Sequence, residues 1–527
     1  MISSGSKGVD MKKYFVAVLF LLMVFSHTAG AQAPKRGGRL IFALESDVST
    51  MNPFVRMIST DQLIRSLMYE TLFDFDLQNK IVPALGESWT ISKDGLEYDV
   101  KLRARVKFHN GEEMTAEDVK WSVEYAMDPK NAATGFSLLK PIESITVVEK
   151  HRIRFKLKEP TAPFLSTLAT VRGFIVVPQN SVPQGAKTVP AYPPGTGPFA
   201  FKAWESRVQT VLVRHKDYWQ KGLPYLDEVI YKPVEDADVR LSALRAGDVH
   251  MIERAPYSYV SKIKSGEIKG IKAVEAKAAG FKRLIFNVLV PPFNNRSLRL
   301  AVANAIDKKQ YLQGAFWGFG SPVDQRYPAG NPWFVKMPQI KRDVSKVKAL
   351  LKEAGVGSDF EVELLGQQGD EAEQQILQQQ LASAGIKMKV RLMEYGSYVQ
   401  KQHERDWQMI IFGGRMQPDP HLLYGVEYIC SEVEQAKAKR ATRNLAAYCN
   451  KEVDELLVEA GRVTDTKKRY EIYAKAIRQI TEDVSEVPLG FYPRFYAHSD
   501  KVKGFVIDDV GSISGTKFGL IRTWMDK

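Results

Sequence analysis

The sequence predicts an α/β protein built from at least two compact lobes. Without its first 33 residues the chain keeps about 490 residues, whereas a single hydrophobic core stops growing at roughly 250–300 residues. Residues 81–178 contain short segments in which apolar and polar residues alternate, as in half-buried strands. From about residue 280 to residue 490, strand-like and helix-like segments alternate instead, which is typical of an α/β layer with parallel strands.

Residues 1–33 are expected to be a signal peptide. Two lysines precede an apolar run over residues 14–25, and small residues follow it. The pattern fits cleavage after either Ala31 or Ala33, and either of the first two methionines fits as the start. The apolar run is shorter than the roughly 20 residues of a membrane span. Because no cysteine lies near the cleavage site, we expect an exported, soluble chain without a lipid anchor.

The charge of the chain argues against a nucleic-acid partner, and its cysteines indicate a disulfide. The chain has 74 Lys and Arg against 61 Asp and Glu, a net charge of +13, which becomes +11 without residues 1–33. The basic residues are interleaved with acids, so no nucleic-acid partner is expected. The two cysteines, Cys430 and Cys449, are expected to form a disulfide in an oxidising compartment, the alternative being two free buried thiols.

The mature fold is expected to begin with a buried strand. Residues 39–44 are mostly apolar, and a polar loop follows over residues 45–53. A helix is then predicted over residues 59–76, because its leucines lie mostly on one side. Either Ser59 or Thr60 is a suitable N-cap for this helix.

The stretch "VKFHNGEEMTAEDVKWSVEYA" predicts a strand end, a tight turn and a helix start. Asn110-Gly111 is a turn signal, and Thr115 with Asp118 comes close to a capping box. His109 lies at the corner between these elements. We expect it to be a turn residue that hydrogen-bonds the backbone rather than a residue that carries chemistry.

A glycine-rich segment further along is not expected to bind a dinucleotide. Gly195, Thr196 and Gly197, with Ala200, match the pattern G-x-G-x-x-A. However, prolines surround the pattern and a strand-like segment follows it, whereas a dinucleotide site needs a strand before the pattern and a helix after it. The glycines are expected to let the backbone approach another backbone or a ligand. Residues 234–253 then predict an Asp-capped helix, which ends at a glycine, and a strand.

The second half of the chain alternates between strands and helices. One of these helices is supported by capping residues, because Asp343 is a suitable N-cap at its start and Gly355 a suitable residue just after its end. The expected elements are a strand at 281–289, helices at 294–316 and 343–355, a strand at 360–366, a helix at 371–385, a strand at 387–394, a helix at 397–407 and a strand at 408–414. The tail after residue 498 predicts short strands again.

No motif of a catalytic or metal site occurs in the sequence. The eight histidines form no H-E-x-x-H pattern, and C-x-x-C, G-x-S-x-G and the phosphate-binding loop G-x-x-x-x-G-K-[ST] are all missing. The sequence therefore predicts binding without chemistry, and neither a cofactor nor a metal is expected.

Several segments together resemble the family 5 solute-binding proteins of ABC importers, which include dipeptide, oligopeptide and nickel binders. The likeness covers the mature chain, and the segments occur in the order found in that family. They are "VPALGESWTISKDGLEYDVKLR", "VKFHNGEEMTAEDVKWS", "GTGPFAF", "FNVLVPPFNNRSLRLAVANAID" and "CNKEVDELLVEA".

The resemblance implies a two-lobe periplasmic-binding-protein fold, the Venus flytrap, with an extra subdomain in the first lobe. The expected boundaries are 34–280 for the first lobe, including the subdomain at about 80–192, 281–492 for the second lobe, and 493–527 for a return to the first. The crossings near residues 280 and 492 would form a hinge. A periplasmic monomer would then enclose a ligand and present it to the permease subunits of an ABC transporter.

The resemblance also implies where ligand binds. In peptide-binding members an acid after a second-lobe strand pairs with the peptide amine, and Asp419 in "MIIFGGRMQPDPHLLYG" is the matching acid, unless it only forms an Asx turn. Arg415 would face an acidic ligand group or make a surface ion pair. The segment "GQQGDEAEQ" lacks the arginine of dipeptide binders, which argues against a strict dipeptide clamp. The remaining candidate ligand contacts are Gly413, Gly414, Met416, Asp47, Asn52 and Thr196.

Two other functions remain open. The same fold could carry a non-peptide solute such as an opine, a sugar conjugate, haem or a chelated metal such as nickel. A secreted hydrolase could use paired carboxylates, for example Asp419 with Glu394, if they lie roughly 5–10 Å apart. No motif supports the hydrolase. The resemblance further implies that Cys430 and Cys449 staple part of the second lobe.

Overall fold

The computed structural model describes Met1 and residues 33–55, 58–170, 174–189, 192–357, 360–438, 442–513, 515 and 517–526. The chain divides into a unit Met1–Lys35 and a compact unit Arg36–Lys527, and the elements below all belong to the second. Most of the predicted signal peptide lies outside the described residues. None of the described helices is long and apolar enough to cross a membrane.

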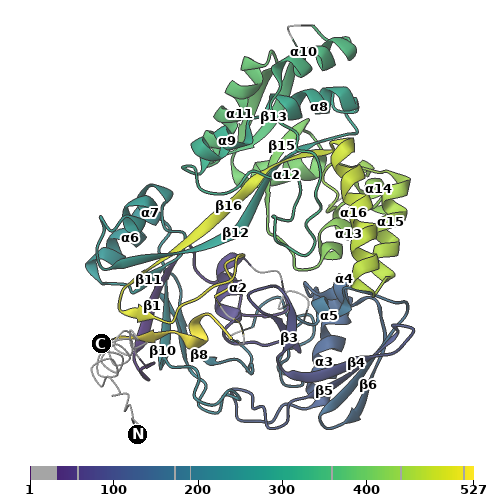
Figure 1. The fold of residues 1–527 in the computed structure, drawn as a ribbon. Coiled ribbons are helices and arrows are strands. Elements are labelled where there is room, and N and C mark those ends of the chain that lie inside the picture. The colour runs from purple at the N-terminus through teal and green to yellow at the C-terminus, as the bar shows by residue number, and fades with distance from the viewer. Residues whose placement is uncertain are drawn as a thin grey trace. The chain divides into compact units, whose positions relative to one another are not determined.

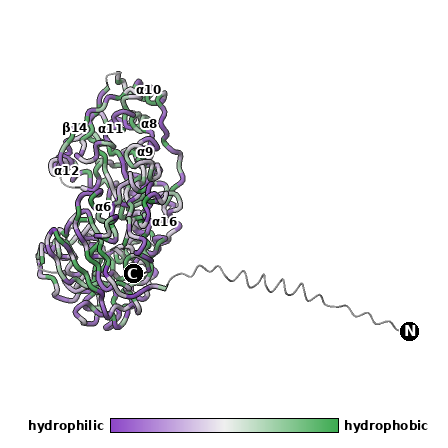
Figure 2. Tube along the Cα trace, turned by 90° about the vertical axis from the view of Figure 1, so that its left-hand side faces the viewer, coloured by the Kyte–Doolittle hydropathy of each residue, from purple (hydrophilic) through white to green (hydrophobic). Residues whose placement is uncertain are grey.

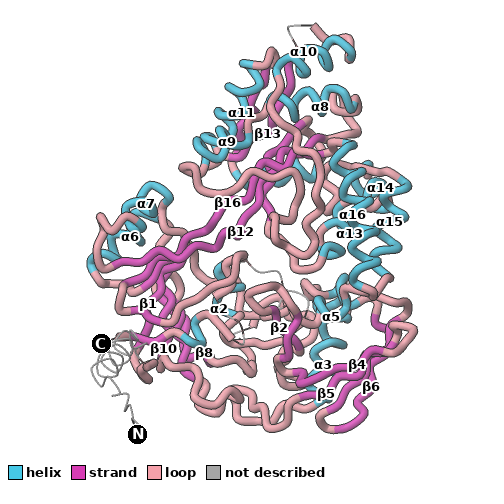
Figure 3. Tube along the Cα trace, in the orientation of Figure 1, coloured by secondary structure: helices cyan, strands magenta, loops and turns pink. Residues whose placement is uncertain are grey.

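Within the described residues, one mixed sheet of ten strands extends through most of the fold (Figure 3). In Figure 1, helices α6 and α7 lie beside middle strands of the sheet, and α8 to α12 lie near one of its ends. In spatial order the strands are β14 (Lys387–Met393), β13 (Glu361–Gln367), β15 (Met409–Gly414), β12 (Ile271–Phe286), β16 (Glu486–Ser499), β11 (Met251–Ile252), β1 (Arg39–Leu44), β10 (Glu228–Pro233), β9 (Gln209–Arg214) and β8 (Phe199–Glu205).

The long strands β12 and β16 form an antiparallel ribbon in the middle of this sheet. At one end β16 pairs with β11, and at the other end β12 pairs with β15. The register of the ribbon is irregular between Ala276 and Gly280, and Gly280 pairs with Tyr492. A side chain on Gly280 would place its Cβ 1.9 Å from the Tyr492 ring, so any larger residue would have to displace this ring. The hinge predicted at residues 280 and 492 coincides with this pair and stays a prediction.

The elements at the β1 end of the sheet follow the local signals of the sequence. Strand β1 has the predicted bounds and pairs in parallel with β10 and β11. Helix α6 (Ala237–Ala246) begins after the Asp236 cap and ends at Gly247 in a left-handed conformation. Helix α2 (Ser59–Arg65) is shorter than predicted and begins after Ile58. The Asp61 carboxylate accepts the N–H of Ile58, so an acid within the first turn caps this helix.

Residues within the predicted extra subdomain form a separate four-stranded sheet in the order β4-β5-β7-β6. Helix α3 begins at the predicted capping box, since the N–H of Thr115 donates to Asp118 over 2.8 Å. The elements are β4 (Gly86–Ile91), β5 (Glu97–Leu102), α3 (Ala116–Met127), α4 (Phe136–Leu139), β6 (Ile142–Glu149), β7 (Arg152–Leu157) and α5 (Phe164–Thr167). Small pieces nearby are β2 (Phe73–Phe75), β3 (Ile81–Pro83) and η1 (Pro129–Asn131).

The second half of the chain alternates as predicted, and β13 is parallel to both β14 and β15. The single helix expected over residues 294–316 is wrong. It divides into α8 and α9 because the Asp307 side chain accepts the N–H groups of Lys309 and Gln310 and so starts a new helix. The helices are α7 (Tyr257–Lys264), α8 (Arg296–Ala305), α9 (Lys308–Ala315), α10 (Val344–Glu353), α11 (Glu371–Ser383), α12 (Tyr395–Glu404), α13 (Tyr424–Glu427), α14 (Ser431–Lys437), α15 (Lys451–Arg462) and α16 (Thr466–Asp483). The remaining pieces are η2 (Pro420–Leu422), β17 (Val502–Lys503), η3 (Leu520–Arg522) and β18 (Trp524–Met525).

Separate hydrophobic clusters support the division into lobes. One large cluster gathers residues between Leu40 and Met251 with others from the C-terminal end. Two further clusters lie within the second half of the chain. Helices such as α8 and α11 alternate between hydrophobic and hydrophilic colours in Figure 2, as expected of helices with one buried side. We use "first lobe" for residues 36–280 and 493–526, and "second lobe" for residues 281–492.

Candidate functional site

A cavity lies where the segment after β15 meets the first lobe. Its second-lobe wall is formed by residues 415–418, and its first-lobe wall by residues of α2, the segment that follows it and the C-terminal segment 508–521. It contains about 1320 Å³ of space not occupied by protein atoms, part of it open to solvent. Ligand sites are typically found in clefts of this kind between lobes.

Arg415 links the two lobes across this cavity. Its Nη1 donates to Oε1 of Gln62 over 3.1 Å, and its Nη2 donates to Oγ of Ser59 over 3.0 Å. A second bridge lies between the extra subdomain and the C-terminal end of α15, where Arg462 pairs with Glu159 at 2.6 Å. The two lobes are therefore in contact at more than one place.

The first-lobe wall of the cavity carries three carboxylates, those of Glu70, Asp74 and Asp508. Glu70 accepts hydrogen bonds from Oη of Tyr218 at 2.7 Å and from Nε1 of Trp219 at 3.0 Å. Burial raises the pKa of Glu70 to about 7, although these donors oppose the shift. This wall thus contains an acid that titrates near neutral pH.

Asp508 lies in the C-terminal segment and is only 8% exposed. Its Oδ1 accepts the backbone N–H groups of Val510 at 3.1 Å and Ser512 at 2.7 Å. Burial raises the pKa of Asp508 above its usual value, and these hydrogen bonds only partly compensate. Neither Glu70 nor Asp508 forms an ion pair among the described residues.

A second cavity adjoins the first, since both are lined by Arg415, Met416 and Gln417. Its wall contains Arg283 and Arg326, which belong to a buried ionic cluster. Arg283 contacts Glu486 at 2.5 Å and Glu427 at 2.8 Å, and Arg326 contacts the same two carboxylates at 2.9 and 2.5 Å. Although burial opposes it, the two glutamates raise the pKa of Arg326. The cluster holds two positive and two negative charges.

Of the predicted contacts at the end of β15 and just after it, Gly414, Arg415 and Met416 line these cavities, whereas Gly413 does not appear in the described lining. Gly414 lines the second cavity and Met416 lines both. Gly413 is exposed, and an added Cβ at Gly414 would meet no atom within 4 Å. The structure therefore leaves room for the backbone of a ligand to approach Gly413 and Gly414. Their role in binding stays a prediction.

Asp419 is paired within the second lobe, and its role in amine binding stays a prediction. It is 5% exposed, and its two oxygens accept from Nη1 and Nη2 of Arg469, both at 2.7 Å. It also accepts the N–H of His421, as an Asx-type turn would. Asp419 is not among the described residues that line either cavity. Its partner within the second lobe already neutralises its charge.

The other predicted first-lobe contacts are not gathered at the cavity either. Asp47 accepts hydrogen bonds from Nε1 of Trp204 at 3.1 Å and from the N–H of Arg207 at 2.7 Å. Asn52 is fully buried and donates to the carbonyl of Ala186. Thr196 is fully buried, and its effect on Glu70 partly opposes the rise in the pKa of that acid. In the described lining these three residues do not appear.

His109 is a structural residue, as predicted. Its Nδ1 accepts the N–H of Gly195 at 3.1 Å, so its Nε2 carries the proton that is donated to the carbonyl of Gly197 at 3.0 Å. Burial lowers the pKa of His109 to about 3. Gly195 and Gly197 pack against the backbone of residues 67 and 68, where an added Cβ would lie 2.0 to 2.5 Å from carbonyl oxygens. The glycines serve backbone packing, as the sequence indicated.

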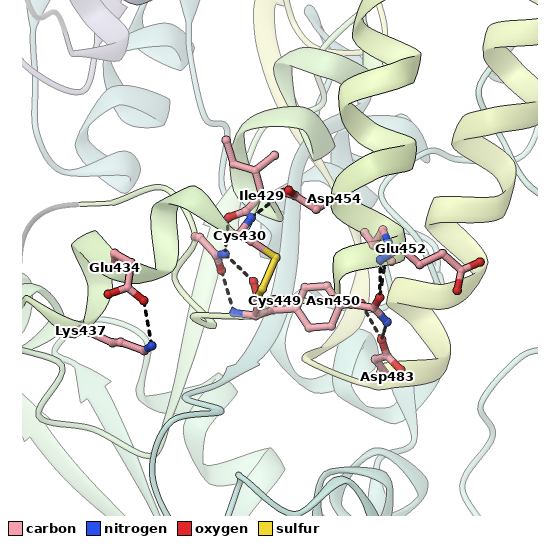
Figure 4. Close-up of a disulfide and its surroundings, with 12 residues drawn as sticks. Ile429, Cys430, Glu434, Lys437, Cys449, Asn450, Glu452, Asp454 and Asp483 are labelled. Carbon is pink, nitrogen blue, oxygen red and sulfur yellow. Dashed lines mark hydrogen bonds and ion pairs between the residues drawn. A yellow bond between two sulfur atoms is a disulfide. The ribbon is translucent and has the colours of Figure 1, made fainter.

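The predicted disulfide between Cys430 and Cys449 is present (Figure 4). The N–H of Cys430 donates to Asp454 of α15 over 2.7 Å. Asn450, next to Cys449, caps α15 and donates to Asp483 at the end of α16. The bridge therefore joins the α14 segment to the helical hairpin of the second lobe. The paired carboxylates suggested for a hydrolase are both occupied, because Glu394 caps α12 by accepting N–H groups.

Sequence reasoning missed Glu70, Asp508 and the arginines of the second cavity. Glu70 lies in a segment that was assigned to one long helix, and Asp508 lies in the tail. No local pattern connects residues 438 positions apart, so the fold alone brings these two acids to one wall. In the described part of the chain, no group of three or more His, Cys, Asp or Glu residues could hold a metal ion.

A family model and a curated relative both match most of the chain. The model of "Bacterial extracellular solute-binding proteins, family 5 Middle" matches residues 80–430. The glutathione-binding protein GsiB of Pectobacterium atrosepticum is 29% identical over 479 residues, covering 89% of this chain and 91% of the relative.

Solved structures extend the comparison to the fold. The periplasmic binding protein DppA of Helicobacter pylori, in complex with the peptide STSA, matches with a TM-score of 0.78 and 26% identity over 94% of this chain and 99% of its own. The binding protein AgaA of A. tumefaciens R10, in complex with agropinic acid, matches with a TM-score of 0.77 and 27% identity over 93% and 99%. These matches confirm the predicted two-lobe periplasmic-binding-protein fold.

Proposed function

The chain belongs to the family 5 bacterial extracellular solute-binding proteins, and from this premise we propose that it captures short peptide-like solutes between its lobes. Members of the family bind small-molecule or peptide ligands and work with ABC permeases, and the relatives are transport proteins rather than enzymes. The observation that carries the proposal is the cavity at the end of β15, which residues of both lobes enclose.

The backbone around β15 favours a peptide-like ligand. In the described sheet, β13 pairs with β15 only at Met409 and Ile410. Gly413 and Gly414 pair with β12 on their other side, which leaves one edge of these glycines without a neighbouring strand. An extended ligand can add to such an edge through main-chain hydrogen bonds. The likeness to a glutathione-binding protein and to a peptide complex supports the same class of ligand.

An opine-like solute is the second candidate. The likeness to AgaA, which was solved with agropinic acid, supports it, as does the arginine-containing wall of the second cavity. Asp419, the acid expected to bind a peptide amine, is paired with Arg469 instead. A ligand whose acidic groups contribute more than its amine would fit this arrangement.

Calorimetry and thermal unfolding of the purified protein test the proposal. The probes are reduced glutathione, the peptide Ser-Thr-Ser-Ala and agropinic acid. A true ligand at about 100 times its Kd should add about 2.7 kcal/mol to the free energy of unfolding, and mass spectrometry should recover it unchanged. The variant Arg415→Gln should bind more weakly, whereas Arg478→Gln, at an exposed position of α16, should bind like wild type. Binding of agropinic acid alone would favour the opine, and turnover of a bound probe would contradict a transport role.

A further inference from the structure

The charges around the two adjoining cavities are separated by lobe. The first cavity is lined by three carboxylates, and Arg415 is the only cation of its described lining. The second cavity is lined by four arginines, including Arg415 and Arg443, against the single carboxylate of Glu427. Even after the buried Glu486 behind this wall is included, the second cavity keeps an excess of positive charge. The separation therefore gives the cleft a negative first-lobe side and a positive second-lobe side.

Two of the acids on the first-lobe side, Glu70 and Asp508, have no cationic partner among the described residues. Glu70 accepts hydrogen bonds from the neutral side chains of Tyr218 and Trp219, and Asp508 accepts them from backbone N–H groups. No lysine or arginine pairs with either carboxylate among the described residues. A buried carboxylate without a cation is unfavourable unless it takes up a proton or a ligand supplies the positive charge.

Two features of the second-lobe side favour an acidic ligand group. Nε of Arg283 is buried at the second cavity without a hydrogen-bond partner in the described structure. Arg443 is exposed at the same cavity, and no acidic partner is found for it within the described residues. Arginine side chains of this kind bind carboxylates well because their N–H groups match the two oxygens.

We propose that the cleft takes a dipolar solute, with a positively charged nitrogen toward Glu70 and Asp508 of the first lobe and an acidic group toward Arg443 and Arg283 of the second. This inference rests on the proposed function and assigns the polarity of its ligand. It reverses the direction expected from Asp419, which would place the amine against the second lobe.

The polarity also explains how binding could favour closure. Each charged end of the solute contacts a different lobe, so both contacts form together only when the lobes approach one another. A ligand shifts a conformational equilibrium by its difference in affinity for the two states. A dipolar solute of sufficient length therefore favours the closed arrangement, whereas a solute with one charged end gains only part of this difference.

The experiment uses reduced glutathione and Ser-Thr-Ser-Ala, each in its free form, with the amine acetylated and with the carboxylates esterified or amidated. Calorimetry is done on wild type, Asp508→Asn and Arg443→Gln. The matched controls are Asp509→Asn, an exposed neighbour of Asp508, and Arg478→Gln on α16. Melting temperatures verify that each variant is folded.

Acetylation of the amine should weaken binding to wild type by about tenfold or more. Asp508→Asn should bind the free form as weakly as wild type binds the acetylated form, and should no longer distinguish the two. Arg443→Gln should likewise lose part of its discrimination against the blocked carboxylates, and both controls should behave as wild type. If acetylation costs Asp508→Asn as much as it costs wild type, the amine does not lie at this wall and the polarity is wrong.

Proton release gives an independent readout. A cation beside Glu70 should lower the pKa of this acid from about 7, so that binding of the free amine near pH 7 releases protons into the buffer. The acetylated probe, and Glu70→Gln with either probe, should release none. A probe that binds wild type without this proton release contradicts the polarity but leaves the proposed function standing. If neither peptide probe binds wild type, the peptide proposal fails and the polarity falls with it.

Discussion

Two buried carboxylates of the molecule, Asp419 in the second lobe and Asp508 in the first, have opposite surroundings. Asp419 faces the guanidinium of Arg469 through two hydrogen bonds of 2.7 Å. Asp508 lines the cavity between the lobes and accepts the backbone N–H groups of Val510 and Ser512. Asp419 has a counter-charge without a ligand, whereas the described residues contain no cation paired with Asp508. The difference teaches that burial alone does not identify a binding residue, because a buried acid with its own partner stabilises the fold.

The largest expected effect comes from breaking the complete pair. Asp419→Asn should lower the free energy of unfolding by about 3–5 kcal/mol, because Arg469 would remain buried without its counter-charge. Asp508→Asn should change stability much less, since the variant keeps an oxygen for the N–H groups of Val510 and Ser512. Denaturant unfolding of both variants measures this contrast. A loss of ligand affinity of about 100-fold in Asp419→Asn, at unchanged stability, would instead restore the amine-binding role of Asp419.

The disulfide is expected to give the next largest effect. Like Asp419, it should affect stability and not ligand binding. Replacing Cys430 and Cys449 together with serine should cost about 3 kcal/mol of stability, because the bridge closes a loop with a sequence separation of 19. Ligand affinity measured below the melting temperature should be unchanged, since the bridge joins helices of the second lobe. Alkylation of the protein without prior reduction checks the bridge itself, and the labelling of two thiols would contradict it.

Glu70 should make stability fall as the pH rises. Its ordinary pKa is 4.5 and its pKa in the folded protein is about 7, so the folded state binds the proton more tightly than the unfolded state does. The contribution of Glu70 to the free energy of unfolding is present at low pH and is lost as the pH rises through 7. Between about pH 5 and about pH 8, unfolding of wild type and Glu70→Gln should diverge by on the order of 1–3 kcal/mol. Parallel pH profiles would show that Glu70 has no raised pKa.

His109 should give the smallest effect and the opposite dependence on pH. His109→Ala removes a hydrogen bond to the carbonyl of Gly197 and should cost about 0.5–1.5 kcal/mol at neutral pH. The pKa of His109 is lowered from 6.5 to about 3, so its contribution is present above about pH 6.5 and is lost as the pH falls toward 3. Calorimetry with the best probe should show unchanged affinity. A large loss of binding at an unchanged melting temperature would show that His109 acts on the ligand.

Local signals predicted those parts of the fold that are determined locally. Strand β1, the capping box at Thr115 and the Gly247 end of α6 were all found where the sequence placed them, because each depends on a few adjacent residues. The helix over residues 59–76 was predicted too long, since its leucines also suit the buried segment and short strand that follow Arg65. Tertiary packing therefore determines where the helix ends and the short strand begins.

The candidate site was predictable only in part, for the same reason. The segment after β15 was identified because it resembles a family pattern, and Arg415 and Met416 do lie at the cavity. The opposite wall depends on Glu70 and Asp508, which meet only in the folded chain. That Asp419 is paired could not be known either, because Arg469 lies 50 residues further on in a helix with no sequence signal of its own for the site.

The ribbon of β12 and β16 restricts how the lobes can separate. Two strands joined by hydrogen bonds on both sides of the Gly280–Tyr492 pair bend and twist as one strip, unlike a single flexible linker that permits rotation about many axes. Because Gly280 has no side chain and the register of the ribbon is irregular beside it, we expect the strip to bend most easily at this pair. We therefore expect the lobes to open along one reproducible path, so that each cycle returns the same two surfaces to the same separation for the permease to recognise.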